Sequence, residues 1–377
     1  MHTKPASIKS VAKREWPLAV SSATTVLFLL FGRTWFGDLS NPLWFALMLA
    51  WLFGAISISA FAVVRHAEGL AERVGEPLGT LVLTLSMSGM EMMMIAAVMY
   101  FGAGGSALGR DTMLAILMVV LNGLVGASLL VGGLRYHEQT YNLYGANAFL
   151  SLIVPLSVLG LVMPSFTVSS QGPTLSPLQS TFLILMSLGL YGVFLAIQTM
   201  RHRDYFVTSH AAQGSAGHTE THGNHEEQSA KHHGVLLLAY VPFIVLLAKQ
   251  IATPIDYGIN VFGAPAALGG LLVATLILSP ESLAAVRAAR ANQIQRSINL
   301  SLGTALSSIS LTVPAVLIIG FLTGKTVILG LSPSDMVLLL LTLVVSMLTF
   351  ALERTNVLQG AIHLLLFLAY LILIFEK

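Results

Sequence analysis

Long apolar runs separated by short polar segments dominate the chain. Eleven of these runs, at about 17 to 25 residues each, are long enough to cross a bilayer as helices. Their approximate limits are 16–31, 42–64, 78–102, 112–134, 147–168, 178–200, 235–251, 261–286, 296–322, 334–352 and 356–375. Because a membrane-spanning backbone must satisfy its own hydrogen bonds, the pattern predicts an all-α membrane protein with eleven transmembrane helices.

One polar segment is much longer than the others and divides the chain. It runs from Arg201 to Gly234 and contains seven histidines and three glutamates. Five predicted helices lie on each side of it, and one extra helix precedes them. The predicted organisation is an N-terminal segment with the first helix (1–41), a first five-helix repeat (42–200), a His-rich loop (201–234) and a second five-helix repeat (235–377).

The two halves carry a matching stretch. LGTLVLTLSMSGME starts at Leu78 and ends at Glu91, while LGGLLVATLILSPE starts at Leu268 and ends at Glu281, each at its fourteenth residue. A Gly-x-Pro sequence precedes both copies. Because each half has an odd number of helices, the two copies must cross the membrane in opposite directions. This pattern is typical of inverted-repeat transporters, whose ion sites lie near the midplane where the repeats meet.

The second copy has a proline directly before its glutamate. Pro280 lacks a backbone N–H, and its ring clashes with the carbonyl of Leu276, so we expect the helix to break or kink there. Carbonyl oxygens freed inside a bilayer need a partner. A cation held jointly by these oxygens and Glu281 would provide one.

Composition agrees with a membrane protein. Of the 377 residues, 55% are hydrophobic and only 10% are charged, whereas about a quarter of a soluble domain is charged. The Lys and Arg residues lie in short blocks between apolar runs, which argues against nucleic-acid binding. The chain has no cysteine, which excludes disulfides, thiolate metal sites and cysteine nucleophiles.

The distribution of positive charge predicts the orientation. If the N-terminus is inside, 14 of the 19 Lys and Arg residues fall on the cytoplasmic side and five on the other. This bias predicts a cytoplasmic N-terminus and a cytoplasmic His-rich loop, with the C-terminus outside.

Glu91 and Glu281 are the predicted cation and proton ligands. Glu91 is the only charged residue between Glu76 and Arg110, and a carboxylate near the middle of a membrane is costly and usually functional. A structural role is the alternative: Glu91 as a protonated side chain bonded to a neighbouring helix, Glu281 as an interfacial residue. Their matching places in two copies favour the functional interpretation.

Polar side chains in neighbouring helices complete the predicted site. They are Ser88 and Ser279 beside the glutamates, Asn122 in the fourth run, and Thr304, Ser307 and Ser308 in the ninth. Thr304, Ser308 and Thr312 are four residues apart and share one helix face. Packing of small residues between helices is the alternative explanation for these hydroxyls.

Two histidine features have open interpretations. His363 lies in the last apolar run, where it could relay protons or be a satisfied buried histidine. The His-rich loop is predicted to be a disordered linker that collects divalent ions weakly, and structured metal sensing is the alternative.

Several stretches carry a family resemblance. They are GEPLGTLVLTLS, LNGLVGASLLVGG, YGVFLAIQT, ILSPESL, NQIQRSINLSLGTALSSISLTVP and ERTNVLQGAIHL. Together they closely resemble ChaA-type calcium/proton antiporters, a branch of the cation/proton exchangers in the calcium/cation antiporter superfamily. The resemblance implies two inverted five-helix repeats in a bacterial inner (plasma) membrane, with Glu91 and Glu281 binding cation or proton alternately.

The chain departs from the family pattern at both glutamates. Where that family often has Gly-Asn three residues before the glutamate, this chain has Met87-Ser88 and Ile277-Leu278, so both asparagines are absent. Where many relatives have Gly-Ser-Ala-Thr-Gln in the ninth helix, this chain has Gly-Thr-Ala-Leu-Ser at 303–307. The resemblance therefore leaves the preference among Ca²⁺, Na⁺ and K⁺ open.

The predicted function is secondary antiport by alternating access. The chain is expected to export Ca²⁺ in exchange for protons, with Na⁺ and K⁺ as further candidate substrates. Neither enzymatic activity nor a cofactor is expected. The alternatives are a primarily monovalent Na⁺/K⁺ to proton antiporter and, from a different class, an intramembrane enzyme or a zinc-regulated membrane protein. The apolar runs contain no His-Glu-x-x-His, nucleophile elbow or paired aspartates, which argues against an enzyme. The expected partners are Ca²⁺, protons and the lipid bilayer, without nucleic acid, and a homo-oligomer is left open.

Overall fold

The apolar runs of the sequence form membrane-length helices. The computed structural model describes residues 15–75, 78–101, 107–201, 203–206 and 229–376, and this part of the chain contains helices and no strand. Ten helices are long and apolar enough to cross a membrane, and an eleventh apolar helix, α14 (Pro333–Thr349), has 17 residues. The prediction of an all-α membrane protein with eleven helices is confirmed.

The extra N-terminal helix is α2 (Trp16–Trp35). The first half then contains α3 (Pro42–Val74), α4 (Leu78–Phe101), α5 (Leu108–Leu117) continued by η1 (Met118–Leu124) and α6 (Val125–Tyr136), α7 (Leu143–Ser157) continued by η2 (Val158–Val162) and η3 (Met163–Ser165), and α8 (Pro177–Ala196) continued by η4 (Ile197–Arg201). After the short η5 (Arg203–Phe206), the second half contains α10 (Ala230–Asn260), α11 (Ala266–Arg290), α12 (Ile294–Ser307) continued by η6 (Ser308–Thr312) and α13 (Val313–Thr323), α14, and α15 (Val357–Phe375).

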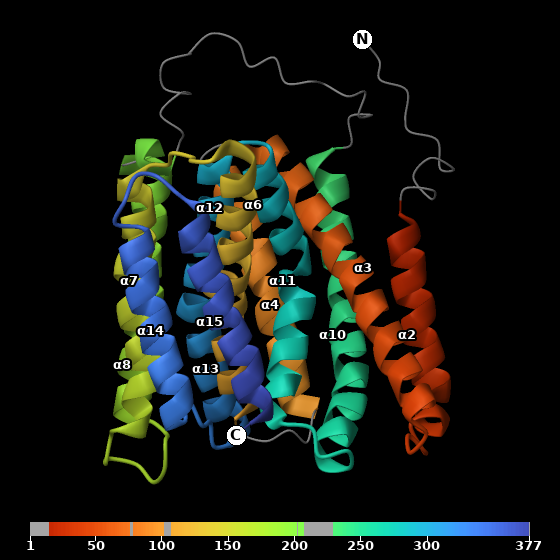
Figure 1. Cartoon of the computed structure of the whole chain (residues 1–377). Helices are drawn as coiled ribbons and strands as arrows, with labels where there is room; N and C mark the ends of the chain where they lie inside the picture. Colours follow the sequence, from red (N-terminus) through yellow and green to blue (C-terminus); the bar gives the residue numbers. More distant parts are fainter. Residues whose placement is uncertain (1–14, 76–77, 102–106, 202, 207–228, 377) are drawn as a thin grey trace, which may run out of the picture.

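The two halves interlock with their glutamate helices at the centre. In Figure 1, α4 descends and α11 ascends through the middle of the bundle, so the two copies of the repeat run in opposite directions. Each contacts the other half: α4 packs against η6, and α11 packs against α5, η1 and α6. The helix α2 lies at one edge, against α3 and α10. The predicted inverted arrangement of two five-helix repeats is confirmed.

Both copies of the repeat begin with a glycine in the left-handed region. Gly75, at the end of α3, has φ 75°, and Gly263, between α10 and α11, has φ 70°. This conformation favours glycine because it has no Cβ. Each of these two glycines thus turns the chain sharply ahead of a glutamate helix.

The third membrane helix of each half contains a π-helical segment at mid-length. These segments are η1 in the first half and η6 in the second, and the two helices that contain them are the most buried of the bundle. A π turn is rare and marks functional positions more often than ordinary helix does. The repeat therefore extends beyond the glutamate helices to the helices that pack on them.

The predicted helix break at Pro280 is wrong. α11 continues through Pro280 as far as Arg290. The hydroxyl of Ser279 donates to the carbonyl of Leu276 at 2.9 Å, which is the carbonyl that the proline ring leaves without its usual N–H partner. A side chain one residue away from the proline therefore satisfies this oxygen, which we had expected a cation to bind.

One helix limit differs from the hydropathy pattern at the end of the His-rich loop. α10 begins at Ala230, five residues before the predicted start, with the side chain of Ser229 as its N-cap. His232 and His233 form its first turn, which polar composition alone had assigned to the loop. Residues 207–228, on which the predictions of a disordered linker or a metal sensor mainly fall, lie outside the described residues.

Candidate ion-binding site

A cavity lined by apolar and polar side chains lies between the two halves of the bundle. It has a volume of about 400 Å³ and is lined by residues of α4, α7, α8, α11 and α12. Both predicted ligands, Glu91 and Glu281, line it. Ser88, Thr304 and Ser307 line it as well. The structure therefore brings five of the predicted site residues to one cavity.

Glu91 is held by two hydroxyl groups from the opposite half. Its side chain is buried, at 3% exposure. Ser308 Oγ donates to Glu91 Oε2 at 2.7 Å, and Thr312 Oγ1 donates to Glu91 Oε1 at 3.0 Å. Both donors lie in η6, so the π-helical segment of the second half positions the carboxylate of the first. Hydroxyl donors of this kind stabilise a carboxylate in its ionised form.

Glu281 is buried without equivalent donors. Its side chain is 4% exposed, and within the described part of the chain its Oε2 has no hydrogen-bond partner. A buried polar oxygen without a donor is costly. A proton on this carboxylate, or a cation beside it, would remove that cost.

Asn122 and His363 belong to a different polar cluster. Asn122 Nδ2 donates to Thr342 Oγ1 at 2.8 Å, and Asn122 Oδ1 lies 3.2 Å from His363 Nδ1. The other ring nitrogen of His363, Nε2, lies 3.0 Å from Thr349 Oγ1. These contacts connect η1, α14 and α15, and neither residue lines the cavity, nor does Ser279. Three residues predicted for the site thus have structural partners elsewhere.

The cavity opens toward one face of the membrane bundle. Gln295, Arg296 and Asn299, in the first turns of α12, line it together with Gln198 of η4. Arg296 is exposed, and Figure 1 places the start of α12 at the same end as the start of α10. The sequence analysis missed these mouth residues, although NQIQRS and YGVFLAIQT were among the stretches that carried the family resemblance.

On the other side of the glutamates the bundle is packed with apolar side chains. The buried residues there include Met94, Val98, Val273 and Ile277, which follow Glu91 along α4 or precede Glu281 along α11. Because the two helices run in opposite directions, both sets lie toward the same face. The described structure thus gives water access to the two carboxylates from the face with the start of α12 and blocks it from the opposite face.

The oxygen atoms of this cavity suit a hard cation. Two buried carboxylates and several hydroxyls are the ligand types that Ca²⁺ and similar ions prefer. Within the described residues, no group of three or more His, Asp or Glu side chains converges in a metal-holding arrangement. Two buried carboxylates at one cavity, inside a bundle of membrane-length helices, are the arrangement expected of a polytopic membrane transporter.

Comparison with known proteins identifies the family. The model for the sodium/calcium exchanger protein family matches residues 44–200 and 232–376. The sodium-potassium/proton antiporter ChaA of Escherichia coli (strain K12) is 40% identical over 353 residues, which cover 94% of each chain. This chain belongs to the sodium/calcium exchanger family and is a multi-pass cation antiporter. The predicted family and transporter class are confirmed.

More distant relatives share the fold. The Ca(2+)/H(+) antiporter of Aphanothece halophytica is 21% identical over 319 residues, covering 82% of this chain and 84% of that protein. The solved structure of native YfkE superposes with a TM-score of 0.71 at 17% identity, over 96% of this chain and 100% of that one. The H+/Ca2+ exchanger CAX superposes with a TM-score of 0.63 at 17% identity, over 95% and 88%.

Proposed function

We propose that this chain is a proton-coupled antiporter that exports Ca²⁺ from the cytoplasm of a bacterium in exchange for incoming protons. Glu91 and Glu281 are its ion ligands, and Ser88, Thr304, Ser307 and Ser308 supply neutral oxygens around them. One observation carries the proposal: two buried carboxylates from matching helices of the two halves line a single cavity.

Competition between proton and cation is the coupling mechanism. A carboxylate must lose its proton before it can bind a metal ion, so cation binding releases protons and proton binding releases the cation. Two carboxylates match the charge of one divalent ion, and water in the cavity can complete the six to eight oxygens that Ca²⁺ prefers. Ionising both glutamates without a cation leaves two like charges in one cavity at membrane depth, which is unfavourable. The empty, doubly charged state is therefore avoided, and the site crosses the membrane carrying protons or metal.

Alternating access accounts for the one-sided cavity. If the N-terminus is cytoplasmic, as the positive charge distribution predicts, then the end with the start of α12 is cytoplasmic and the C-terminus is outside. The described conformation is then the cytoplasm-facing one, with apolar residues of α4 and α11 closing the outer side. Movement of one half against the other would open that side instead.

A second candidate is an antiporter that mainly exchanges Na⁺ or K⁺ for protons. It is favoured by the 40% identity to the protein named sodium-potassium/proton antiporter ChaA, because the Ca(2+)/H(+) antiporter of Aphanothece halophytica is only 21% identical. A monovalent ion needs only one ionised glutamate. In this case Glu91, with its two hydroxyl donors, is the ionised one and Glu281 stays protonated.

Calcium-45 uptake into inverted membrane vesicles under an imposed ΔpH tests both candidates. We expect uptake by the wild-type chain, competitive inhibition by Na⁺, and loss of uptake in Glu91→Gln and Glu281→Gln with normal expression. Glu138→Gln is the matched control, because Glu138 is a surface carboxylate paired with Arg354. Absence of Ca²⁺ uptake together with Na⁺-driven dissipation of ΔpH would favour the monovalent candidate. Uptake near the wild-type rate in either glutamine variant would remove that glutamate from the mechanism.

A further inference from the structure

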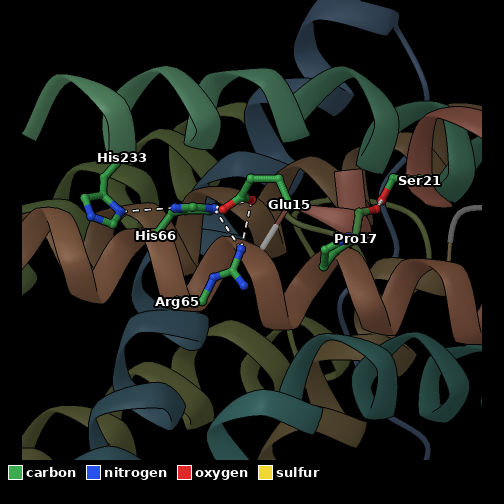
Figure 2. A network of polar contacts seen from close by, with 6 residues as sticks. All are labelled: Glu15, Pro17, Ser21, Arg65, His66 and His233. Carbon is green, nitrogen blue, oxygen red and sulfur yellow. Dashed lines mark hydrogen bonds and ion pairs between the residues drawn. The ribbon is translucent and has the colours of Figure 1, made fainter. Parts of the chain in front are cut away.

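A second cluster of titratable groups lies at the end of the bundle where the ion cavity opens. Figure 2 shows Glu15, Arg65, His66 and His233 side by side, from the residue before α2, from α3 and from the first turn of α10. His66 is 1% exposed, Glu15 8% and His233 9%. Three helices that are distant in sequence therefore meet at a buried carboxylate and two buried imidazoles.

His66 bridges the other two groups with its two ring nitrogens. His66 Nε2 lies 3.0 Å from Glu15 Oε2, and His66 Nδ1 lies 3.1 Å from His233 Nδ1. Arg65 Nη2 donates to the same Glu15 oxygen at 2.9 Å. The second oxygen of Glu15 is buried and has no hydrogen-bond partner among the described residues. The carboxylate can therefore stabilise more positive charge than Arg65 alone provides.

We propose that Glu15, His66 and His233 form a proton-binding site, separate from the transport glutamates, that holds α3 against α10 with one proton shared between its imidazoles and releases that contact when a second proton binds. The site makes exchange sensitive to the pH on the face where the ion cavity opens. This proposal rests on the proposed function in one respect: antiport is one of the two properties by which the proton site is tested.

The first proton is accommodated with the contacts of His66 to Glu15 and to His233 both kept. In the singly protonated pair, His66 Nε2–H donates to Glu15 and His66 Nδ1–H donates to the lone pair of His233 Nδ1. The neutral pair can also bond, because one Nδ1 then donates to the other. The contact between α3 and α10 is therefore satisfied with no proton or one proton added to the two rings.

The second proton breaks the contact. When both rings are imidazolium ions, both Nδ1 atoms carry hydrogen and neither can accept. Two N–H groups then face each other across 3.1 Å, and two like charges lie within one buried cluster. Burial of both rings and the charge of the first imidazolium oppose the second proton, so the change requires acidification below about pH 6.5, the value for an imidazole in water.

The charged and titratable groups around His66 come from each element of the cluster. Glu15 precedes α2, and Arg65 is on α3 itself. On α10, His233 bonds to the ring, while His232 and Tyr240 approach it with ring centroids at 6.3 and 6.1 Å. The two other helices packed on α3, α4 and α11, direct their buried glutamates into the ion cavity instead.

The packing of α3 explains how the cluster can act on transport. α3 packs against α10 on one side and against both glutamate helices on the other. Loosening its contact with α10 removes support from α4 and α11, so we expect acid on this face to slow exchange. Glu15 lies before residue 44, where the match to the family model begins.

The contact between α3 and α10 depends on a glycine. A Cβ on Gly69 would lie 2.6 Å from Cε1 of the His233 ring, closer than real contacts allow, so any side chain there must displace the imidazole. Gly69→Ala therefore breaks the histidine contact without removing a titratable group. It complements His233→Gln, which removes the second proton acceptor and keeps a polar side chain.

The first experiment compares exchange in inverted vesicles at external pH 7.5 and 5.5. Proton competition at the transport glutamates lowers the rate at pH 5.5 in every variant. The quantity compared between variants is therefore the ratio of the rate at pH 7.5 to the rate at pH 5.5. We expect the wild-type ratio to exceed that of His233→Gln by about threefold or more, and Gly69→Ala to be slow already at pH 7.5. His232→Gln is the matched control, an adjacent histidine without a bond to His66, and it should keep the wild-type ratio. Equal ratios in wild type and His233→Gln would overturn the proposal.

The second experiment measures the helix contact without transport. The chain has no cysteine, so spin labels can be placed at Phe61→Cys on α3 and Leu238→Cys on α10, both exposed positions. We expect the distance distribution between the labels to lengthen or broaden as pH falls from 7.5 to 5.5, and to be independent of pH in the His233→Gln background. A wild-type distribution unaffected by pH would refute the site even in protein that transports ions normally. If no cation is exchanged at all, the proposed function fails while this measurement still decides the proton site.

Discussion

The hydroxyl pair on Glu91 offers the sharpest test of how the cavity balances protons against cations. Thr312→Val keeps the shape of the side chain but removes the donor that lies 3.0 Å from Glu91 Oε1. Because valine fills the space of threonine, little room remains for water to replace the lost bond. The carboxylate oxygen then stays unsatisfied in its ionised form, and a proton competes with the cation more effectively.

The size of the effect follows from the energy of such a bond. A hydrogen bond to a charged group contributes about 1.5 to 3 kcal/mol, and about 1.4 kcal/mol corresponds to a factor of ten in affinity. We take the lower end, since Ser308 still donates to the other oxygen of Glu91, and expect the apparent KM for the exported cation to rise about tenfold at pH 7. Ser308→Ala should give a smaller increase, because the space left by the hydroxyl can admit water.

The assay is cation-dependent dissipation of ΔpH in inverted vesicles, titrated with cation at pH 7 and at pH 9. If proton competition causes the defect, the ratio of mutant to wild-type KM shrinks at pH 9, where protons are scarce. Ser310→Ala is the matched control, because Ser310 is buried in the same π-helical segment and its hydroxyl has no hydrogen-bond partner within the described structure. A KM within twofold of wild type for Thr312→Val at both pH values would show that this bond does not tune the site.

Two further predictions concern residues outside the cavity. Serine at all five histidines of 202–225 should leave both the maximal exchange rate and its pH dependence unchanged, measured by ΔpH dissipation; a changed pH ratio would mean that the loop titrates with the transporter. Asn122→Ala should lower the thermal stability of the purified protein, because it removes the buried hydrogen bonds of Asn122 to Thr342 and to His363 at a cost of about 1 to 3 kcal/mol. The KM for cation should stay within twofold of wild type. A large increase in KM without loss of stability would return Asn122 to the ion site.

The fold could be predicted because the membrane leaves few choices. Hydropathy and the requirement for satisfied backbone groups gave eleven helices, and the odd number in each half gave the inversion. The paired glutamates were visible because two copies of one stretch ended in the same residue. The inverted arrangement of the two repeats was enough to predict that the two glutamates line one cavity.

The partners of individual polar residues could not be predicted in the same way. Asn122 looked like an ion ligand because it is an amide in an apolar span, but its partners, Thr342 and His363, are more than 200 residues away in sequence. Pro280 does free a carbonyl, but a serine at the adjacent position satisfies it. Glu15 was hidden in the basic segment before the first apolar run, since nothing local indicates that it is buried against His66.

The two glutamates differ in their hydrogen-bond partners because the two halves share a backbone arrangement but carry different polar side chains. Each glutamate helix packs against the π-helical segment of the opposite half: α4 against η6, and α11 against η1. The segment η6 offers three hydroxyls, and two of them, on Ser308 and Thr312, bond to Glu91. The segment η1 offers the amide of Asn122, but this amide is bonded to Thr342 and faces His363, so Glu281 Oε2 has no donor within the described chain. The symmetric backbone therefore carries two carboxylates with different surroundings. Glu91 is already satisfied in its charged form, whereas Glu281 needs a proton or a cation. A site that exchanges protons for cations requires a carboxylate of this second kind.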